Sequence, residues 1–183
     1  MTKRFFLTIV IALVFGAAAA AVDPALNGEW FNAQGDFRFN DGNWEGWTDD
    51  NPMVKGTYTA WDGAITIRVD YVHGNILNDF LLEFPLLISF DPRWYSQSEV
   101  REIIINGAVE LALAEDESLA ALFTMFRETI MVMFEEQFGP EFDNRLNEIF
   151  LLAEGTYSVS GNTLTLVFDG DFFGGGGGEF TRR

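Results

Sequence analysis

The sequence predicts a mainly β protein: an antiparallel meander or barrel of about eight strands that is interrupted by an α-helical insert. Short alternating apolar and polar segments with hairpin-type turns fill residues 28–71. A hairpin of the same design returns 99 residues later, and the chain between the two copies changes to helical periodicity. We therefore expect one barrel domain over residues 22–183, with a mostly helical insert at about 75–153 between the matched hairpins.

The first residues have the order of a secretory signal peptide. Two basic residues, Lys3 and Arg4, precede a twelve-residue apolar run that ends at Gly16, and only alanines follow as far as Ala21. We expect residues 1–21 to be a signal peptide, with cleavage within two residues of Ala21. The apolar run is too short for a transmembrane anchor. The mature chain is therefore predicted to be exported, periplasmic or secreted, without such an anchor.

The chain is strongly acidic. It carries 28 acidic and 11 basic residues, a formal net charge of −17, and loss of Lys3 and Arg4 would take this to −19. Such a charge repels phosphate backbones and anionic bilayers, so neither nucleic acid nor an anionic membrane surface is an expected partner. There is no cysteine to form a disulfide, and the material for a core is supplied by 19 Phe, five Trp and four Tyr.

Hairpin turns separate the predicted strands. The dipeptides Gln34-Gly35, Asp41-Gly42 and Asp62-Gly63 are of the kind that join neighbouring antiparallel strands. A final strand would follow the five glycines Gly174–Gly178, which we interpret as a flexible link because glycine loses the most entropy when it is ordered. The strands expected in these regions are residues 29–31, 36–39, 43–47, 56–61, 65–69 and 179–182.

The two hairpins correspond residue by residue. Gly56-Thr57-Tyr58-Thr59 returns as Gly155-Thr156-Tyr157-Ser158, and Ile65-Thr66-Ile67 returns as Leu164-Thr165-Leu166. The offset is 99 residues in both cases, without a gap. A single return at this spacing does not indicate a solenoid. It indicates one hairpin geometry used twice in the same barrel.

The insert begins with a dense apolar run, Leu81–Ile88, which Pro85 interrupts. At this length it is either a strand near a sheet edge or a buried loop. Three helices should follow. The first begins at a capping box formed by Ser96 and Glu99 and would stop at Asn106-Gly107. The second would cover about 116–138 and end at the break Gly139-Pro140, and the third would cover 142–153.

The second predicted helix carries an apolar stripe. Its candidate ligand-binding or interface residues are Phe123, Phe126, Ile130 and Phe134. Because apolar residues occur all round this helix, two interpretations stay open. The stripe either packs as core against the barrel or meets a partner.

The β segments resemble the bacterial lipocalin-like domains, small exported barrels with strands of the form G-T-Y-T-x-x-G-N-T-L-T-L. That form stands here as residues 155–166 and, more weakly, as 56–67. Residues 26–30 are similar to the opening strand of the wider lipocalin group, with its G-x-W signature. The resemblance implies that Trp30 closes one end of the barrel and that a late arginine, Arg182, packs across it. The helical middle section has no counterpart in a plain barrel.

The sequence contains no recognisable catalytic or metal-binding pattern. His73, the only histidine, is interpreted as a solvated loop residue. Without cysteine or a second histidine we expect neither a zinc site nor a histidine-based nucleophile. The oxygen-rich turns at 49–51 and 169–171 lack the ligand spacing of a calcium loop. We therefore expect no metal, no cofactor and no enzymatic activity.

Two functional hypotheses follow. The first is an exported, non-enzymatic binding protein that takes a small apolar ligand in a lipocalin-like barrel, with the helices covering one mouth. The second is an envelope interaction or structural protein whose helical insert forms a homodimer or docks a partner. An enzyme is the weakest of the alternatives because no catalytic constellation is visible.

Overall fold

The computed structural model describes residues 21–33, 35–48, 51–81, 88–114, 117–172 and 175–183. The chain divides into two compact units. The barrel unit comprises Met1–Arg68 and Leu152–Arg183, and the helical unit comprises Val69–Leu151. The predicted signal peptide lies outside the described residues, except for Ala21.

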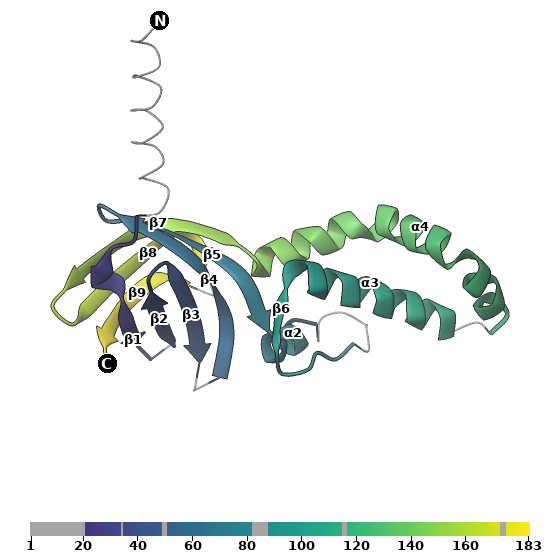
Figure 1. Ribbon diagram of the computed structural model, residues 1–183, viewed down its shortest axis with the longest axis horizontal. Coiled ribbons are helices and arrows are strands. Elements are labelled where there is room, and N and C mark those ends of the chain that lie inside the picture. The colour runs from purple at the N-terminus through teal and green to yellow at the C-terminus, as the bar shows by residue number, and fades with distance from the viewer. Residues whose placement is uncertain (1–20, 34, 49–50, 82–87, 115–116, 173–174) are drawn as a thin grey trace, which may run out of the picture. The chain divides into compact units, whose positions relative to one another are not determined.

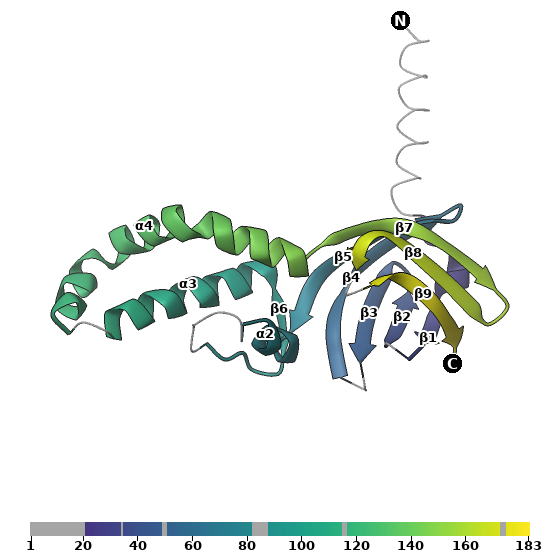
Figure 2. The same cartoon turned by 180° about the vertical axis from the view of Figure 1, so that it is seen from behind.

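Eight strands close into a barrel, which confirms the predicted fold class (Figures 1 and 2). Neighbouring strands follow the order β4-β3-β2-β1-β9-β8-β7-β5, and a further pairing between β4 and β5 completes the circle. The strands are β1 (Gly28–Phe31), β2 (Asp36–Asn40), β3 (Asn43–Thr48), β4 (Asn51–Trp61), β5 (Ala64–His73), β7 (Leu152–Ser160), β8 (Thr163–Phe172) and β9 (Gly175–Arg182).

Alternation along each strand separates the barrel interior from solvent. In β4, Val54, Tyr58 and Ala60 are buried, whereas Thr57 and Thr59 are exposed. Successive side chains of a strand point to opposite faces of the sheet, so one set fills the interior and the other meets water. The polar–apolar alternation that predicted strands therefore also predicted which residues point inward.

The matched hairpins form as expected and lie next to each other. The first turns at Asp62 and Gly63, both with positive φ (51° and 78°), as a tight type I′ connection requires. The second turns at Gly161, whose φ is 59°. Strand β5 of the first hairpin pairs with β7 of the second, with Ile65 opposite Gly155. The repeated sequence thus builds four strands of one barrel wall.

The glycine run corrects one prediction. Strand β9 already begins at Gly175, so most of the run is a strand and not a flexible link. A Cβ atom at Gly177, whose φ is +119°, would overlap the carbonyl oxygen of Leu166 in β8. Only glycine permits this close approach of the two backbones. The cost of ordering glycine is therefore offset by the pairing of β9 with β8.

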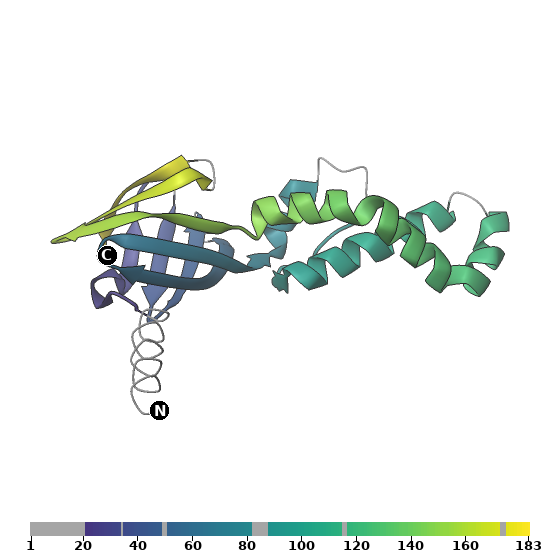
Figure 3. The same ribbon diagram turned by 90° about the horizontal axis from the view of Figure 1, so that it is seen from above.

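In the described part of the helical unit, the end of β5 is followed by one short strand and three helices. The end of β5 pairs with β6 (Trp94–Ser96), and α3 and α4 lie side by side (Figure 3). The side-chain amide Nε2 of Gln97, at the start of α3, donates to Asn147 Oδ1, near the end of α4 (2.9 Å), so the two helices are antiparallel. The helices are α2 (Gly74–Leu81), α3 (Gln97–Ala114) and α4 (Glu117–Ile149). Of the predicted apolar run at 81–88, residues 82–87 lie outside the described part.

Two predicted helix ends were wrong. Helix α3 continues through Asn106-Gly107, because the missing side chain of Gly107 admits Ile88: a Cβ there would lie 2.7 Å from its Cδ1. Helix α4 continues through Gly139-Pro140, although proline lacks the amide that the helix would use. Arg101 of α3 binds both Glu135 (2.6 Å) and Asp143 (2.7 Å), so it holds the two sides of the proline together.

The predicted third helix is also corrected at its end. Helix α4 stops at Ile149, and Ala153 belongs to β7, where it pairs with Ile67 and is buried on the inner face. Leu146 and Ile149 are buried in α4. Alanine occurs in helices and in strands, so its position four residues after Ile149 was consistent with a helix and did not reveal the start of β7.

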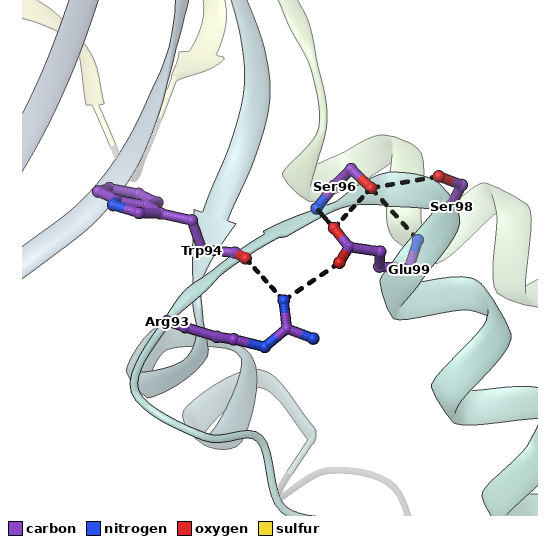
Figure 4. Close-up of polar contacts among 5 residues, drawn as sticks. All are labelled: Arg93, Trp94, Ser96, Ser98 and Glu99. Carbon is purple, nitrogen blue, oxygen red and sulfur yellow. Dashed lines mark hydrogen bonds and ion pairs between the residues drawn. The ribbon is translucent and has the colours of Figure 1, made fainter.

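The capping box at the start of α3 is confirmed (Figure 4). The backbone amide of Ser96 donates to Glu99 Oε2 (2.9 Å), and the amide of Glu99 donates to Ser96 Oγ (3.4 Å). Arg93 adds an ion pair to Glu99 Oε1 at 3.1 Å. The Ser96 amide first, and then Arg93, lower the pKa of Glu99. The cluster fixes the start of α3.

Candidate binding site in the barrel interior

One end of the barrel unit is covered by the short helix η1 (Pro24–Leu26), and we call this the sealed end. Trp30 on β1 is fully buried, and its indole Nε1 donates to the carbonyl oxygen of Leu26 at 2.7 Å. Asp23 caps the helix by accepting from the amide of Ala25 (2.9 Å). The N-terminal segment is thereby held against the inner tryptophan.

Arg182 is the strand partner of Trp30, the residue with which the sequence resemblance pairs it, so both side chains lie on the same face of the sheet. Its guanidinium carbon is 4.4 Å from the centre of the Trp30 ring, close enough for a cation–π interaction. Nη2 donates to the carbonyl oxygens of Ala25 (2.6 Å) and Asn27 (3.4 Å). The backbone of Gly28 packs near the buried Nε, since a Cβ there would lie 3.6 Å away. Arg182 therefore ties β9 to the residues around η1.

Two tyrosines complete the sealed end. The Tyr157 hydroxyl donates to Asp23 Oδ2 at 2.6 Å. Burial and this carboxylate raise the pKa of Tyr157 to about 12, and the same hydrogen bond lowers the pKa of Asp23. The Tyr58 hydroxyl donates to Asn27 Oδ1 (3.2 Å), and the Asn27 amide donates to Asp41 (2.7 Å). These bonds join segments that are far apart in the sequence.

Aromatic rings pack together along the inner face, and we call this group the inner aromatic cluster. Phe37 meets Phe180 edge to face, with ring centres 5.0 Å apart, and Phe39 meets Tyr58 in the same way at 5.0 Å. Phe37 also lies 6.1 Å from Trp44 and 6.2 Å from Phe39. Edge-to-face rings at these distances attract each other beyond their burial. Four strands contribute to the inner aromatic cluster: β2, β3, β4 and β9.

Phe37 is the member of the cluster that reaches solvent. It is half-buried, whereas Phe39, Trp44, Tyr58 and Phe180 are all at least nine-tenths buried. Phe37 stands opposite Trp30 on β1, so its side chain belongs to the inner face. Phe37 is therefore the ring of the inner aromatic cluster that solvent reaches.

Two glycines lie on the inner wall near the phenylalanines. Gly46 is the strand partner of Phe37, but Val54 and Trp44 fill the space beside it: a Cβ there would lie 3.0 Å from Val54 Cγ2 and 3.7 Å from the Phe37 ring. Gly178 is the strand partner of buried Leu166, which places it on the inner face, and a Cβ there would lie 3.7 Å from the Phe180 ring. The inner wall beside Phe180 therefore consists of backbone at Gly178.

Sequence reasoning did not single out the inner aromatic cluster. The alternation in Asp36-Phe37-Arg38-Phe39 places both phenylalanines on one face, and that pattern was available. The partners from β3 and β9 could not be assigned, because the order of strands around the barrel is not visible in a single sequence. Gly178 was assigned to a linker, which removed it from the inner wall.

The predicted helical site residues stay untested. Phe123, Phe126, Ile130 and Phe134 lie in α4, but their side chains are outside the described part of the structure. Among their described neighbours, Val132 and Met133 are exposed (54% and 62%). The choice between core and interface for the predicted stripe therefore stays open.

The interpretation of His73 as a solvated loop residue was wrong. His73 is the last residue of β5 and is 8% exposed. Its strand partner Trp94 covers it, with the ring centres 5.3 Å apart and nearly perpendicular. The amide of Asn75 points to Nδ1 at 3.5 Å. The residue is buried because β6 pairs with the end of β5, a strand too short to be recognised from sequence.

The described part of the chain shows neither a membrane-spanning helix nor a metal-binding cluster. Among the described residues, no helix is long and apolar enough to cross a bilayer. Within the same part of the chain, no group of three or more His, Cys, Asp or Glu side chains lies close enough together to hold a metal ion. Residues 49–50 of one predicted oxygen-rich turn are outside it. Comparisons of the chain with known protein families, curated proteins and solved structures found no match.

Proposed function

We propose that this protein is an exported, non-catalytic binding protein of the lipocalin-like kind, and that it takes a small apolar ligand into its barrel. The observation that carries the proposal is the inner aromatic cluster, which is sealed at the η1 end and accessible at Phe37. A closed barrel of eight strands has an interior that either fills with side chains or holds one small ligand. Gly178 favours the second alternative, because it withholds a side chain from the inner wall beside Phe180.

The resemblance to lipocalin-like domains and the geometry of the sealed end support the same proposal. Trp30 and Arg182, which the resemblance pairs, lie 4.4 Å apart at that end. The order of charge, apolar run and alanines in residues 1–21 supports export. With one histidine and no cysteine, the sequence has no thiol nucleophile and no pair of histidines for acid–base chemistry, which favours a role in binding.

A neutral fluorescent probe tests the proposal. N-phenyl-1-naphthylamine emits strongly only in apolar surroundings and carries no charge at neutral pH. We expect saturable emission with one site per chain. In Gly178→Leu, a side chain would project onto the inner wall beside Phe180, and we expect affinity to fall by about tenfold, which is about 1.4 kcal/mol.

Thr181→Leu is the matched control. It adds a side chain of the same kind to the same strand, but Thr181 is exposed and pairs with Phe31 on the outer face. Its affinity for the probe should equal that of the wild type. Near-ultraviolet circular dichroism establishes that both variants keep their packing. The proposal is wrong if the wild type shows no saturable emission, or if a folded Gly178→Leu variant binds as tightly as the control.

A further inference from the structure

The cations of the barrel unit are already engaged by other groups. This unit contains twelve acidic and only five basic residues beyond residue 20. Arg38 contacts Glu29 (3.4 Å) and lies over the Trp47 ring. Arg183 contacts Asp36 (3.1 Å).

The remaining three basic residues are engaged as well. Arg182 is held by Trp30 and two backbone carbonyls at the sealed end. Lys55 and Arg68 each have an interaction partner within the protein. All five basic residues are described, and each is engaged by at least one group. The Nε atoms of Arg38 and Arg182 have no hydrogen-bond partner, but both are buried, Arg38 Nε at 3.4 Å from Glu29 and Arg182 Nε beside the backbone of Gly28, so neither is open to a negatively charged group that enters the barrel.

The polar groups that reach the inner face are engaged in the same way. The Trp44 indole donates to the carbonyl oxygen of Arg68 at 2.9 Å, and the Trp30 indole donates to Leu26. The hydroxyls of Tyr58 and Tyr157 donate to Asn27 and Asp23. These four donors would have to leave their partners before they could solvate an anion. Around the inner aromatic cluster, the described side chains offer a ligand apolar contact.

Resting on the proposed function, we infer that the ligand of this barrel is uncharged, and that anionic amphiphiles such as fatty-acid carboxylates are excluded. A carboxylate that leaves water without reaching an open cation or donor loses its hydration without replacement. The acidic barrel unit also lowers the local concentration of anions. An uncharged aromatic or hydrocarbon molecule meets neither penalty and can pack against Phe37 and its neighbours.

Two probes of the same shape test this inference on the full protein. N-phenyl-1-naphthylamine and 8-anilino-1-naphthalenesulfonate share the anilinonaphthalene frame and differ by one sulfonate. We expect the sulfonate to weaken binding at least about 30-fold, which is about 2 kcal/mol. The difference should persist in high salt, because salt screens long-range repulsion but leaves the loss of hydration in place.

A variant with an added cation sharpens the test. Asn32 is half-buried and lies beside Gly178, since a Cβ at Gly178 would be 3.4 Å from its Nδ2. Asn32→Lys should strengthen binding of the sulfonate by about tenfold, with the neutral probe unaffected. Asn32→Met, of similar length without charge, controls for the lost hydrogen bonds and should leave the ratio of the two affinities unchanged.

The outcomes separate the two proposals. If both probes bind the wild type equally well, or the sulfonate binds more tightly, the inference about charge is wrong while the binding function stands. If neither probe binds, the proposed function itself fails. An unchanged preference in a folded Asn32→Lys variant would also count against the inference, because the missing cation would then not be what excludes the anion.

Discussion

The barrel unit combines a buried core with polar bonds between distant residues, whereas the helical unit adds exposed ion pairs between its helices to a buried core of its own, which includes Val100 and Leu146. In the barrel, large buried side chains carry the structure, and polar bonds such as Tyr157 to Asp23 join residues 134 positions apart. In the helical unit, the hairpin of α3 and α4 is bridged on its surface by Arg101, which is partly exposed and reaches two carboxylates. Burial strengthens each contact and exposure weakens it. Removal of a buried ring of the barrel should therefore cost far more than removal of an exposed ion pair between α3 and α4.

The largest effect is expected at Trp30. Trp30→Ala removes a fully buried ring, the hydrogen bond to Leu26 and the surface under Arg182, and should cost about 3–5 kcal/mol of unfolding free energy. Urea denaturation followed by circular dichroism measures it. Trp61→Ala is the control, because Trp61 is 72% exposed and its loss should change stability little. Equal stabilities of the two variants would contradict the sealed end described above.

A smaller and pH-dependent effect is expected at Tyr157. Removal of its hydroxyl in Tyr157→Phe should cost about 1–2 kcal/mol near neutral pH, since the acceptor is a carboxylate. The pKa of Tyr157 is raised from 10.0 to about 12, so the contribution is present below pH 10 and disappears as the pH rises toward 12. The pKa of Asp23 is lowered from 3.8, so the contribution also disappears as the pH falls below that value.

The stability difference between wild type and Tyr157→Phe should thus be flat across neutral pH and shrink at both extremes. Tyr58→Phe is the control, because Tyr58 donates to the neutral side chain of Asn27. Its stability difference should not shrink at the acid end. Guanidinium titrations at a series of pH values measure both, and a Tyr157→Phe difference that stays constant below pH 3.8 would contradict the role of Asp23.

Removal of ion pairs from the helical unit should lower the free energy of unfolding by less than the substitutions in the barrel. Arg101→Met keeps the aliphatic stem but removes the ion pairs with Glu135 and Asp143, and we expect a loss of about 1 kcal/mol because the pairs are partly solvated. Arg145→Met removes one exposed pair with Glu148 and should cost less than about 0.5 kcal/mol. Far-ultraviolet circular dichroism during denaturation compares the two. A loss of unfolding free energy in Arg101→Met as large as that in Trp30→Ala would contradict the difference expected between exposed ion pairs and a buried ring.

The smallest effect is expected on the exposed face of α4. Val132→Ser and Met133→Ser should each change stability by less than about 0.5 kcal/mol if this face meets only water. Light scattering before and after the substitutions reports the oligomeric state. A dimer that dissociates on substitution would instead assign this face to an interface and favour the second hypothesis for the helical insert.

The barrel was more predictable than the helical unit for a physical reason. Alternation and type I′ turns are local, so Asp41-Gly42 and Asp62-Gly63 marked hairpins correctly. The helix ends were decided by tertiary contacts instead. Gly107 continues α3 because Ile88 packs against it, and Pro140 lies within α4 where Arg101 spans it.

The candidate site was only partly predictable. Trp30 and Arg182 came from a motif, but the inner aromatic cluster depends on which strands are neighbours around the barrel. Gly178 shows the difficulty most clearly. Its neighbours in sequence are those of a linker, while its role follows from its position opposite Leu166 in β8. Likewise, His73 is buried by a three-residue strand that carries no pattern of its own.

The central claim, that the barrel carries an uncharged apolar ligand, is tested most directly on protein purified from its own host. A native mass spectrum gives the mass and stoichiometry of whatever stays bound, and extraction into an apolar solvent recovers it for identification. The account predicts one bound molecule per chain that extracts without acidification and bears no ionisable acid. A bound fatty-acid carboxylate would contradict the inferred charge, and a ligand-free dimer would contradict the binding function.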